Sequence, residues 1–183
     1  KEGVTGTYSS GTGLTTFTAP YGAKTGLIAV NNTTGANYTA TNTSGGTYTI
    51  EGEHTGLIIG VPYESKYTLS PQYVREAAGN GVIAITSGRY QIRTISFDYE
   101  NSGFFQVEVT PESRDSYTTI MNGYVVGFSG SVDTPALSSG TLVVPVQSRN
   151  TQFTLNIKSS SHLPMFIPSA EVEGYYHRRS KRI

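Results

Sequence analysis

The sequence contains no cysteine and no tryptophan, and only 14% of its 183 residues are charged. Without cysteine, the chain has no disulfide framework and no thiolate metal site. Lysine plus arginine (13) balance aspartate plus glutamate (13), so the formal net charge is zero. This balance argues against a globally basic nucleic-acid-binding protein, and it leaves little charge repulsion between copies of the chain. No apolar run reaches the length of a membrane span and no signal peptide opens the chain, so we expect no span.

The motifs that enzymes use for catalysis are also lacking. The three histidines are His54, His162 and His177. None of them has the spacing of a metal-binding pair on one helix, and there is no glycine-rich phosphate loop and no Gly-x-Ser-x-Gly sequence. Glu51, Glu53 and His54 lie at a glycine turn, where a solvated turn is a better interpretation than an acid–base cluster. Asp98 and Glu100 lie beside a second turn, which is predicted at residues 100–103, and are expected to face water. We therefore predict no enzymatic activity, no cofactor and no metal site.

What the sequence does contain is abundant threonine, serine, glycine, asparagine and tyrosine, which favour strands and tight turns over helices. Across residues 1–62, turn signals recur about every ten residues, a spacing typical of a β-sandwich or β-barrel. The β-like runs between these turns are 3–5, 14–18, 27–30, 37–40, 47–50 and 57–59. The sequence Thr-Gly-Leu-Ile occurs at 25–28 and again at 55–58. We interpret this echo as chance or as a pair of strands, and not as a solenoid repeat.

Residues 70–79 are the only helical candidate. Ser70 suits an N-cap, Pro71 suits the first helical position, and Gly79 suits the C-terminal end. We therefore predict one short helix near residues 71–78 and place a soft boundary just before it. The two resulting parts are an N-terminal β-rich subdomain, 1–66, and a C-terminal sandwich-like subdomain, 67–183. The predicted fold class is all-β, with antiparallel sheets in a sandwich or platform arrangement and one short helix.

Residues 88–109 are the stretch around which the second part is organised. They are predicted to form two strands joined by a tight hairpin turn at 100–103, where Asn-Ser-Gly tolerates positive φ. The buried face of the outgoing strand changes parity, from Tyr90 and Ile92 to a set that begins at Ile95. A strand cannot change its buried face without a bulge, so we predict a break near residues 93–94. Two interpretations of this break stay open: an ordinary sandwich hairpin with a bulge, which the pattern alone favours, or a break that holds Arg89 and Arg93 so that they reach another chain.

The remaining residues are predicted to be mostly strand. Strand-like runs are 82–85, 117–128, 141–145, 151–158 and 170–176. Residues 129–140 are rich in serine, glycine and proline and are predicted to form a loop, and 163–168 are predicted to be extended. The C-terminal end carries four cations, Arg178, Arg179, Lys181 and Arg182. They form either a solvated tail or a weak contact for DNA or an acidic surface.

Several motifs, in order, resemble the C-terminal part of the tail nozzle proteins of short-tailed bacteriophages, also called tail tubular protein B. The matching segments are 15–21, 62–63, 69–75, 88–93, 99–107, 145–150, 169–176 and 178–180. The resemblance implies a hexameric ring at the end of the virion tail, below the portal and its adaptor ring, with a channel for DNA ejection. It also implies a longer parent with a β-propeller, in agreement with a chain that opens on Lys1 rather than methionine. This piece would then be the platform that docks on the adaptor.

The resemblance implies partners and no catalytic residues. The expected partners are further copies of the chain, the adaptor or head-to-tail connector, tail fibres or spikes, and DNA in non-specific passage. The candidate assembly-interface residues, which lie in the matching motifs, are Arg75, Arg89, Arg93 and Arg149. Two alternatives stay open from the residues alone. A secreted adhesin or carbohydrate-binding sandwich would show a row of exposed aromatic residues on one sheet face. A glycan-cleaving tail enzyme would need carboxylates converging in a groove.

Overall fold

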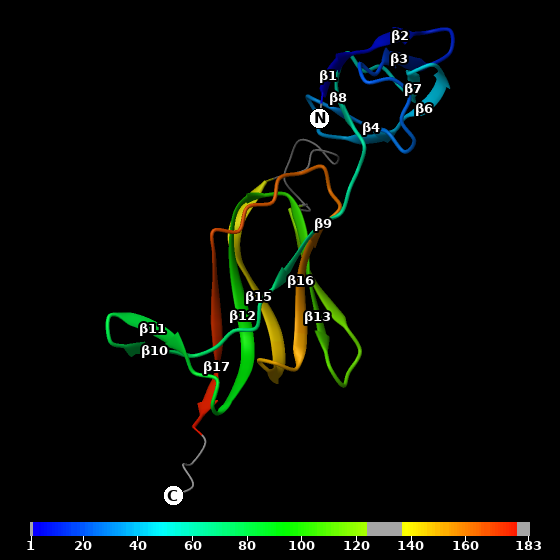
Figure 1. The fold of residues 1–183 in the computed structure, drawn as a ribbon. Coiled ribbons are helices and arrows are strands. Elements are labelled where there is room, and N and C mark those ends of the chain that lie inside the picture. Colours follow the sequence, from blue (N-terminus) through cyan, green and yellow to red (C-terminus); the bar gives the residue numbers. More distant parts are fainter. Residues whose placement is uncertain (1, 124–136, 179–183) are drawn as a thin grey trace, which may run out of the picture. The chain divides into compact units, whose positions relative to one another are not determined.

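A computed structural model describes residues 2–178 except 124–136, and the chain divides into two compact units (Figure 1). The described part of unit 1 is residues 2–63, and that of unit 2 is residues 64–123 and 137–178. Every regular element of the described residues is a β-strand, and all strand pairs are antiparallel. The predicted all-β, antiparallel fold class is therefore confirmed. Since no helix occurs in the described residues, none of them forms a membrane-spanning helix.

Unit 1 packs two four-stranded sheets around one small core. The sheet orders are β1-β8-β4-β5 and β2-β3-β7-β6. The strands are β1 (Glu2–Thr5), β2 (Thr7–Ser9), β3 (Leu14–Thr18), β4 (Ile28–Asn31), β5 (Asn37–Thr39), β6 (Thr41–Ser44), β7 (Thr47–Glu51) and β8 (Gly56–Gly60). The core residues are Phe17, Ala19, Leu27, Ala29, Tyr48, Ile50, Leu57 and Ile59. They come from both sheets, so the two buried faces close on each other.

All six runs predicted in this half are strands, with ends shifted by at most a residue or two. The Thr-Gly-Leu-Ile echo marks two paired strands, since Ala29 of β4 lies opposite Ile59 of β8. The strands β2 and β6 were not predicted, because their residues are mainly polar and exposed and show no apolar alternation.

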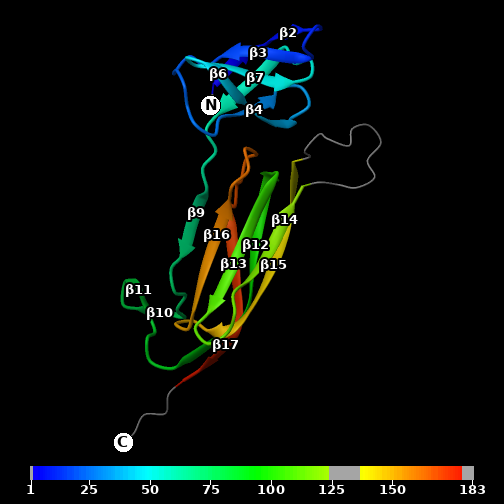
Figure 2. The same cartoon turned by 90° about the vertical axis from the view of Figure 1, so that its right-hand side faces the viewer.

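Unit 2 is a sandwich of two sheets with a separate hairpin beside it (Figure 2). One sheet has the order β15-β12-β17 and the other β14-β13-β16-β9, while β10 and β11 pair only with each other. The strands are β9 (Ser65–Leu69), β10 (Arg75–Ala78), β11 (Gly81–Ala84), β12 (Arg89–Ser102), β13 (Phe104–Pro111), β14 (Tyr117–Asn122), β15 (Ser138–Arg149), β16 (Phe153–Ser159) and β17 (Ser169–His177).

The sandwich core is built by alternation along the long strands. On β12 it takes Ile95 and Phe97, and on β13 it takes Phe105, Val107 and Val109, all at most 1% exposed. Each such side chain stabilises the fold by about 1.5–3 kcal/mol relative to leaving it in water. The predicted burial of one face of β13 is therefore confirmed. The predicted strand 170–176 also exists, as part of β17. Part of the predicted strand 117–128 and of the predicted loop 129–140 lies outside the described residues.

The predicted hairpin between β12 and β13 is wrong, because the two strands belong to different sheets. The chain crosses from one sheet to the other at Gly103, and this crossing is held by Ser102, whose side chain is fully buried. The Ser102 hydroxyl accepts a hydrogen bond from the Phe166 N–H (2.9 Å), and its own hydrogen has two acceptors within reach, the Glu100 carbonyl (3.0 Å) and the Phe166 carbonyl (3.2 Å). The turn-forming residues were recognised correctly, but the bonds that decide where the chain goes next are made to a segment far along the sequence.

The predicted break near residues 93–94 is confirmed. The register of β12 shifts between Ile92 and Thr94 against both neighbours, β15 and β17. Gly174 of β17 lies opposite Ile92, and an added Cβ there would lie 2.4 Å from the Gln91 carbonyl oxygen. On the other side, Gln147 of β15 adopts a φ of 49°, which is rare for a residue with a side chain. Because of the bulge, Ile92 before it and Ile95 after it both point into the core, while β12 stays paired with both neighbouring strands.

The predicted short helix at 71–78 is also wrong. Residues 75–78 form strand β10, which pairs over its whole length with β11. Gly79, with a φ of 59°, starts the turn between them. The capping signals at Ser70, Pro71 and Gly79 are real helix signals, but a helix of two turns is only marginally stable without a buried face. In the structure, pairing between β10 and β11 satisfies the backbone of these residues, and local capping signals do not reveal such pairing.

Candidate assembly interface

The bulge and the strand register bring distant cations together at one end of the sheet β15-β12-β17. Arg89 lies opposite His177 on β17, and Gln91 lies opposite both Arg149 on β15 and Tyr175 on β17. Because Ile92 points into the core, alternation places Arg89, Gln91 and their partners on the outer face. The shared face is a consequence of pairing between residues about 60 to 90 positions apart.

A pocket of about 330 Å³ opens at this end of the sheet. Its lining residues are Thr86, Ser87, Gly88, Arg89, Arg149, His177 and Arg178, and we call it the arginine pocket. Gly88 adopts a φ of 121°, and a Cβ there would lie 2.7 Å from the Tyr176 hydroxyl oxygen. That hydroxyl donates to the Ser87 carbonyl at 2.6 Å. The wall of the pocket is therefore fixed by a residue without a side chain and by a tyrosine that ties it to β17.

The guanidinium groups of the arginine pocket are not all neutralised. Arg178 pairs with Glu76 at 3.4 Å. Arg149 donates to the Gly88 carbonyl at 3.4 Å, and Arg89 donates to the Gln91 side chain, also at 3.4 Å. Within the described residues, neither Arg89 nor Arg149 has a carboxylate partner. Both side chains are exposed, so the pocket carries two positive charges that have no carboxylate partner in the described residues.

Arg93 occupies the bulge itself and is engaged differently. Its guanidinium lies 3.4 Å from the Glu173 carboxylate, and Thr94 donates to the same carboxylate at 3.0 Å. Both charged side chains are more than half exposed, and pairs of this kind contribute at most about 1 kcal/mol. The pair leaves Arg93 at the surface, on the same strand as Arg89.

The other sequence-predicted cations lie elsewhere. Arg75 is exposed on β10, opposite Ala84, and is not part of the pocket. Arg179, Lys181 and Arg182 lie outside the described residues. His177 and the turn 86–88 were not predicted as part of this site. The signal that finds them is the strand register, which a single sequence does not reveal.

One of the carboxylates considered for catalysis, Asp98, has structural partners. Asp98 accepts hydrogen bonds from Ser169 (2.6 Å) and Thr141 (2.8 Å), and these bonds lower the pKa of Asp98. They link β12 to both of its neighbours. In unit 1, the two ring nitrogens of His54 lie within hydrogen-bonding distance of the Asn31 side chain (3.1 Å) and the Glu51 carbonyl (2.9 Å). Across the described residues, no group of three or more His, Asp or Glu side chains is placed to hold a metal ion.

Among the described residues, the most exposed tyrosines of unit 2 do not form the aromatic row expected of an adhesin. The most exposed tyrosines of unit 2 are Tyr67 on β9 (59%) and Tyr175 on β17 (60%), and these strands belong to different sheets.

A family model described as bacteriophage nozzle protein matches residues 1–183. The chain belongs to this family. The nozzle protein is a structural component of the virion tail, and its family is not an enzyme family. Among curated proteins, no sequence matches the chain. The resemblance found in the motifs is thus confirmed at the level of the family. Two of the segments that carried it, 88–93 and 145–150, contribute Gly88, Arg89 and Arg149 to the arginine pocket of this nozzle chain.

Proposed function

We propose that this nozzle protein assembles as a ring of six copies below the portal and its adaptor, and that the ring forms a conduit for DNA ejection. Membership of the nozzle family supports the location in the tail. The observation that carries the assembly is the arginine pocket, with Arg89 and Arg149 exposed and without carboxylate partners in the described chain.

The pocket suits the carboxylate of an adjoining subunit or of the adaptor. A guanidinium group presents paired N–H donors in a plane, which match the two oxygens of a carboxylate and fix its orientation. Tyr175, which lies on β17 two residues before His177, adds an exposed aromatic ring of the kind that is enriched at protein interfaces. Arg93 and Arg75 lie at the edges of this contact in the proposal, and Arg93 exchanges or shares its Glu173 partner there.

The passage of DNA needs a surface that holds the duplex weakly. Each phosphate contact adds salt-dependent affinity, so a continuous stripe of cations would slow the sliding of DNA. The chain has zero net charge, and up to residue 63 its cations are two lysines, Lys1 and Lys24. We infer that DNA contacts are few and non-specific. The cations proposed to make them are clustered near the C-terminal end of the sequence: Arg178, Arg179, Lys181 and Arg182.

The assembly part of the proposal is tested with the double variant Arg89→Ala/Arg149→Ala. Both side chains are exposed and make one long hydrogen bond each, so the melting temperature should stay within a few degrees of the wild type. We expect the variant to lose rings and higher oligomers in mass photometry and negative-stain electron microscopy. The matched control is Lys24→Ala, which removes an exposed cation from unit 1. Normal rings in the double variant, or loss of rings in the control, would contradict the role of the pocket.

A further inference from the structure

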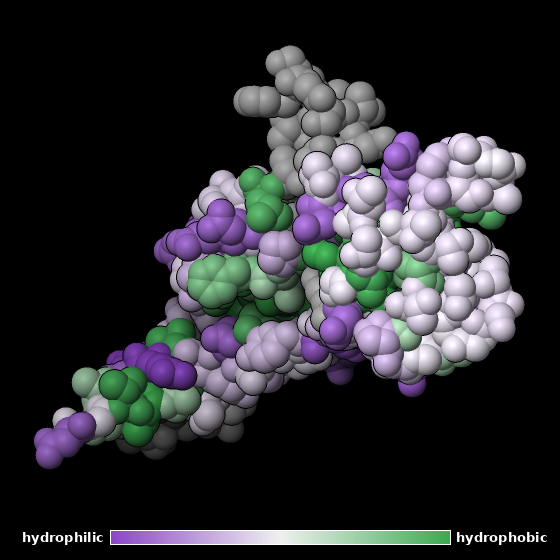
Figure 3. Space-filling view, turned by 90° about the horizontal axis from the view of Figure 1, so that it is seen from above, coloured by the Kyte–Doolittle hydropathy of each residue, from purple (hydrophilic) through white to green (hydrophobic). Residues whose placement is uncertain are grey.

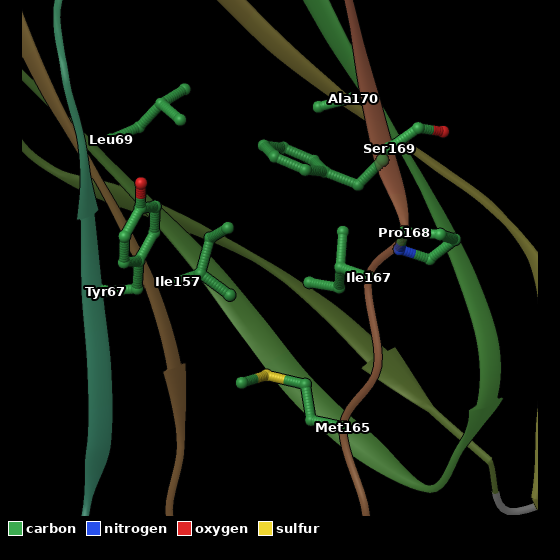
Figure 4. Close-up of a pocket in the computed structure, with 9 residues that line it drawn as sticks. Tyr67, Leu69, Ile157, Met165, Ile167, Pro168, Ser169 and Ala170 are labelled. Carbon is green, nitrogen blue, oxygen red and sulfur yellow. The ribbon is translucent and has the colours of Figure 1, made fainter.

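The sandwich of unit 2 is open along one side. The strands β9 and β17 are the outer strands of their respective sheets, and each has one edge without a strand partner among the described strands. Between them lies a groove of about 420 Å³ (Figure 4). Its apolar lining includes Tyr67, Leu69, Phe97, Ile157, Met165 and Ile167. In Figure 4, Tyr67 and Leu69 on β9 face Met165 and Ile167 across the gap. We call this the β9/β17 groove.

The floor and the rim of the groove differ in exposure. Phe97 and Ile157 at the floor are 1% and 6% exposed, whereas Tyr67 at the rim is more than half exposed. Unpaired strand edges beside an apolar surface are a template for the addition of another strand, and proteins normally cover or charge them. Here the edges flank an apolar groove, so the groove has the properties of a binding site for a β-segment.

Unlike the strands that form the groove, the hairpin β10–β11 packs neither of its faces against another sheet. Its valine and isoleucine, Val82 and Ile83, are 65% and 57% exposed. Adjacent residues of a strand point to opposite sides, so both faces of the hairpin carry an apolar side chain. A two-stranded hairpin alone is only marginally stable in water. Figure 3 shows green, apolar surface at the left of the view, the side to which β10 and β11 project in Figure 1.

The hairpin is held at its base and projects from there. The Glu76–Arg178 ion pair and the bond from the buried Asn150 side chain to the Gln72 carbonyl (2.8 Å) fix it at the end of the sandwich where β17 finishes. Figures 1 and 2 show β10 and β11 outside the two layers of the sandwich. The groove lies toward the start of β17, next to Ser169. The apolar hairpin and the apolar groove of one copy are thus two different surfaces of unit 2.

We propose that the β10–β11 hairpin of one copy docks into the β9/β17 groove of the next copy. The proposal rests on the ring assembly proposed above and names the contact that builds it. Two different surfaces that fit each other form a head-to-tail interface, which closes into a ring when the rotation per copy divides the circle. Charge complementarity supports the hairpin of a second copy as the occupant of the groove. Arg75 on the hairpin and Glu171 on β17 beside the groove are both exposed, and neither has an ion-pair partner within the described chain.

The test uses the absence of native cysteine in the chain. One preparation carries Val82→Cys and a second carries Tyr67→Cys, and the two are mixed and treated with a short bis-maleimide. We expect a cross-linked dimer in the mixture. The control mixture pairs Val82→Cys with Val143→Cys, which is exposed on the outer face of β15, and should give only the background. No cross-link above this background in an assembled sample would overturn the docking, and would leave the groove to another partner.

A second arm separates docking between copies from docking within one. The chain with both Val82→Cys and Tyr67→Cys is cross-linked at high dilution, where an internal cross-link would show that the hairpin covers its own groove and would overturn the proposal. In the third arm, Val82→Asp/Ile83→Asp should raise the concentration needed for half-assembly by about tenfold or more, because charges replace buried apolar anchors. The melting temperature should not change, since both residues are exposed.

The failure of this inference and that of the ring are distinguishable. If the aspartate variant assembles like the wild type while Arg89→Ala/Arg149→Ala does not, the ring stands and the hairpin contact is wrong. If the wild-type chain stays monomeric at every concentration, the ring itself is wrong, and the hairpin contact with it.

Discussion

The two units of the nozzle chain differ in the length of their strands and in the distribution of their arginines and ion pairs. Unit 1 has strands of three to five residues and one closed core. Every arginine of the chain follows residue 63, and all three ion pairs of the described residues lie in unit 2. Unit 2 also has the long bulged strand, the apolar groove and the uncovered hairpin. Within the described residues, both features proposed here as contact surfaces, the arginine pocket and the β9/β17 groove, therefore lie in unit 2.

The largest difference between the two units is expected when one core phenylalanine is truncated in each, because each truncation should destabilise only its own unit. Phe97 and Phe17 are 1% and 3% exposed, and the change of either to alanine leaves a cavity that costs about 3–5 kcal/mol. We expect Phe97→Ala to lower the unfolding transition of unit 2 alone and Phe17→Ala that of unit 1 alone. Differential scanning calorimetry measures both. If each variant shifts the whole unfolding profile equally, the two units do not unfold independently.

A smaller effect is expected at the bulge. Gly174→Ala places a Cβ 2.4 Å from the Gln91 carbonyl oxygen, so strands β12 and β17 must separate locally. Overpacking of this kind costs about 1–3 kcal/mol, and it should lower the melting temperature of unit 2 only. The control is Gly60→Ala in β8 of unit 1, where no atom lies within 4 Å of the added carbon. Equal melting temperatures for Gly174→Ala and the wild type would show that the bulge tolerates a side chain.

The next largest effect is that of acid, which should lower the melting temperature of unit 2 through two of its carboxylates. Hydrogen bonds from Lys158 and then Asn156 lower the pKa of Glu108, and bonds from Ser169 and Thr141 lower that of Asp98. A lowered carboxyl pKa stabilises the folded state above the unfolded values, here 4.5 and 3.8, and this contribution is lost as pH falls through the folded values. We expect the melting temperature of unit 2 to decline below about pH 4.5, and Glu108→Gln to flatten that decline. A variant with the full acid dependence of the wild type would rule Glu108 out as its source.

The smallest effect concerns DNA. In a gel-shift titration at near-physiological salt, we expect weak retention that does not distinguish between sequences, because phosphate contacts carry no sequence information. Replacing Arg178, Arg179, Lys181 and Arg182 with alanine should remove most of this retention and reduce its dependence on salt. Lys24→Ala in unit 1 serves as the matched control. Tight retention of one sequence over another would contradict the proposed role of a ring of these chains as a conduit.

The sequence predicts the local features of both units well. Alternation identified the buried face of β13, and the parity change of residues 90–97 located the bulge. Both signals are local, since each depends on side chains within a few positions. The helix at 71–78 was wrong for the same reason, because local capping signals do not reveal that Arg75–Ala78 pairs with a neighbouring strand.

The parts that could not be predicted depend on distant residues. Residues 100–103 cross between sheets, and a bond that holds them in place joins Ser102 to Phe166, 64 positions away. The arginine pocket requires Arg89, Arg149 and His177 to be placed by the pairing of three strands. Motif resemblance placed Arg89 and Arg149 in matching segments, but their proximity comes only from the fold.

The crossing at Gly103 has a consequence for the order of events during synthesis. Strands β12 and β13 follow each other in the chain, yet β12 finds its partners only in β15 and β17, which are made later. Pairing between such distant segments is slow, because a long loop must close before any bond forms. Arg89, Arg149 and His177 therefore come together only after residues 169–177 have left the ribosome. A nascent chain has no arginine pocket before that point, so the subunit contact proposed for the pocket cannot form between half-made chains.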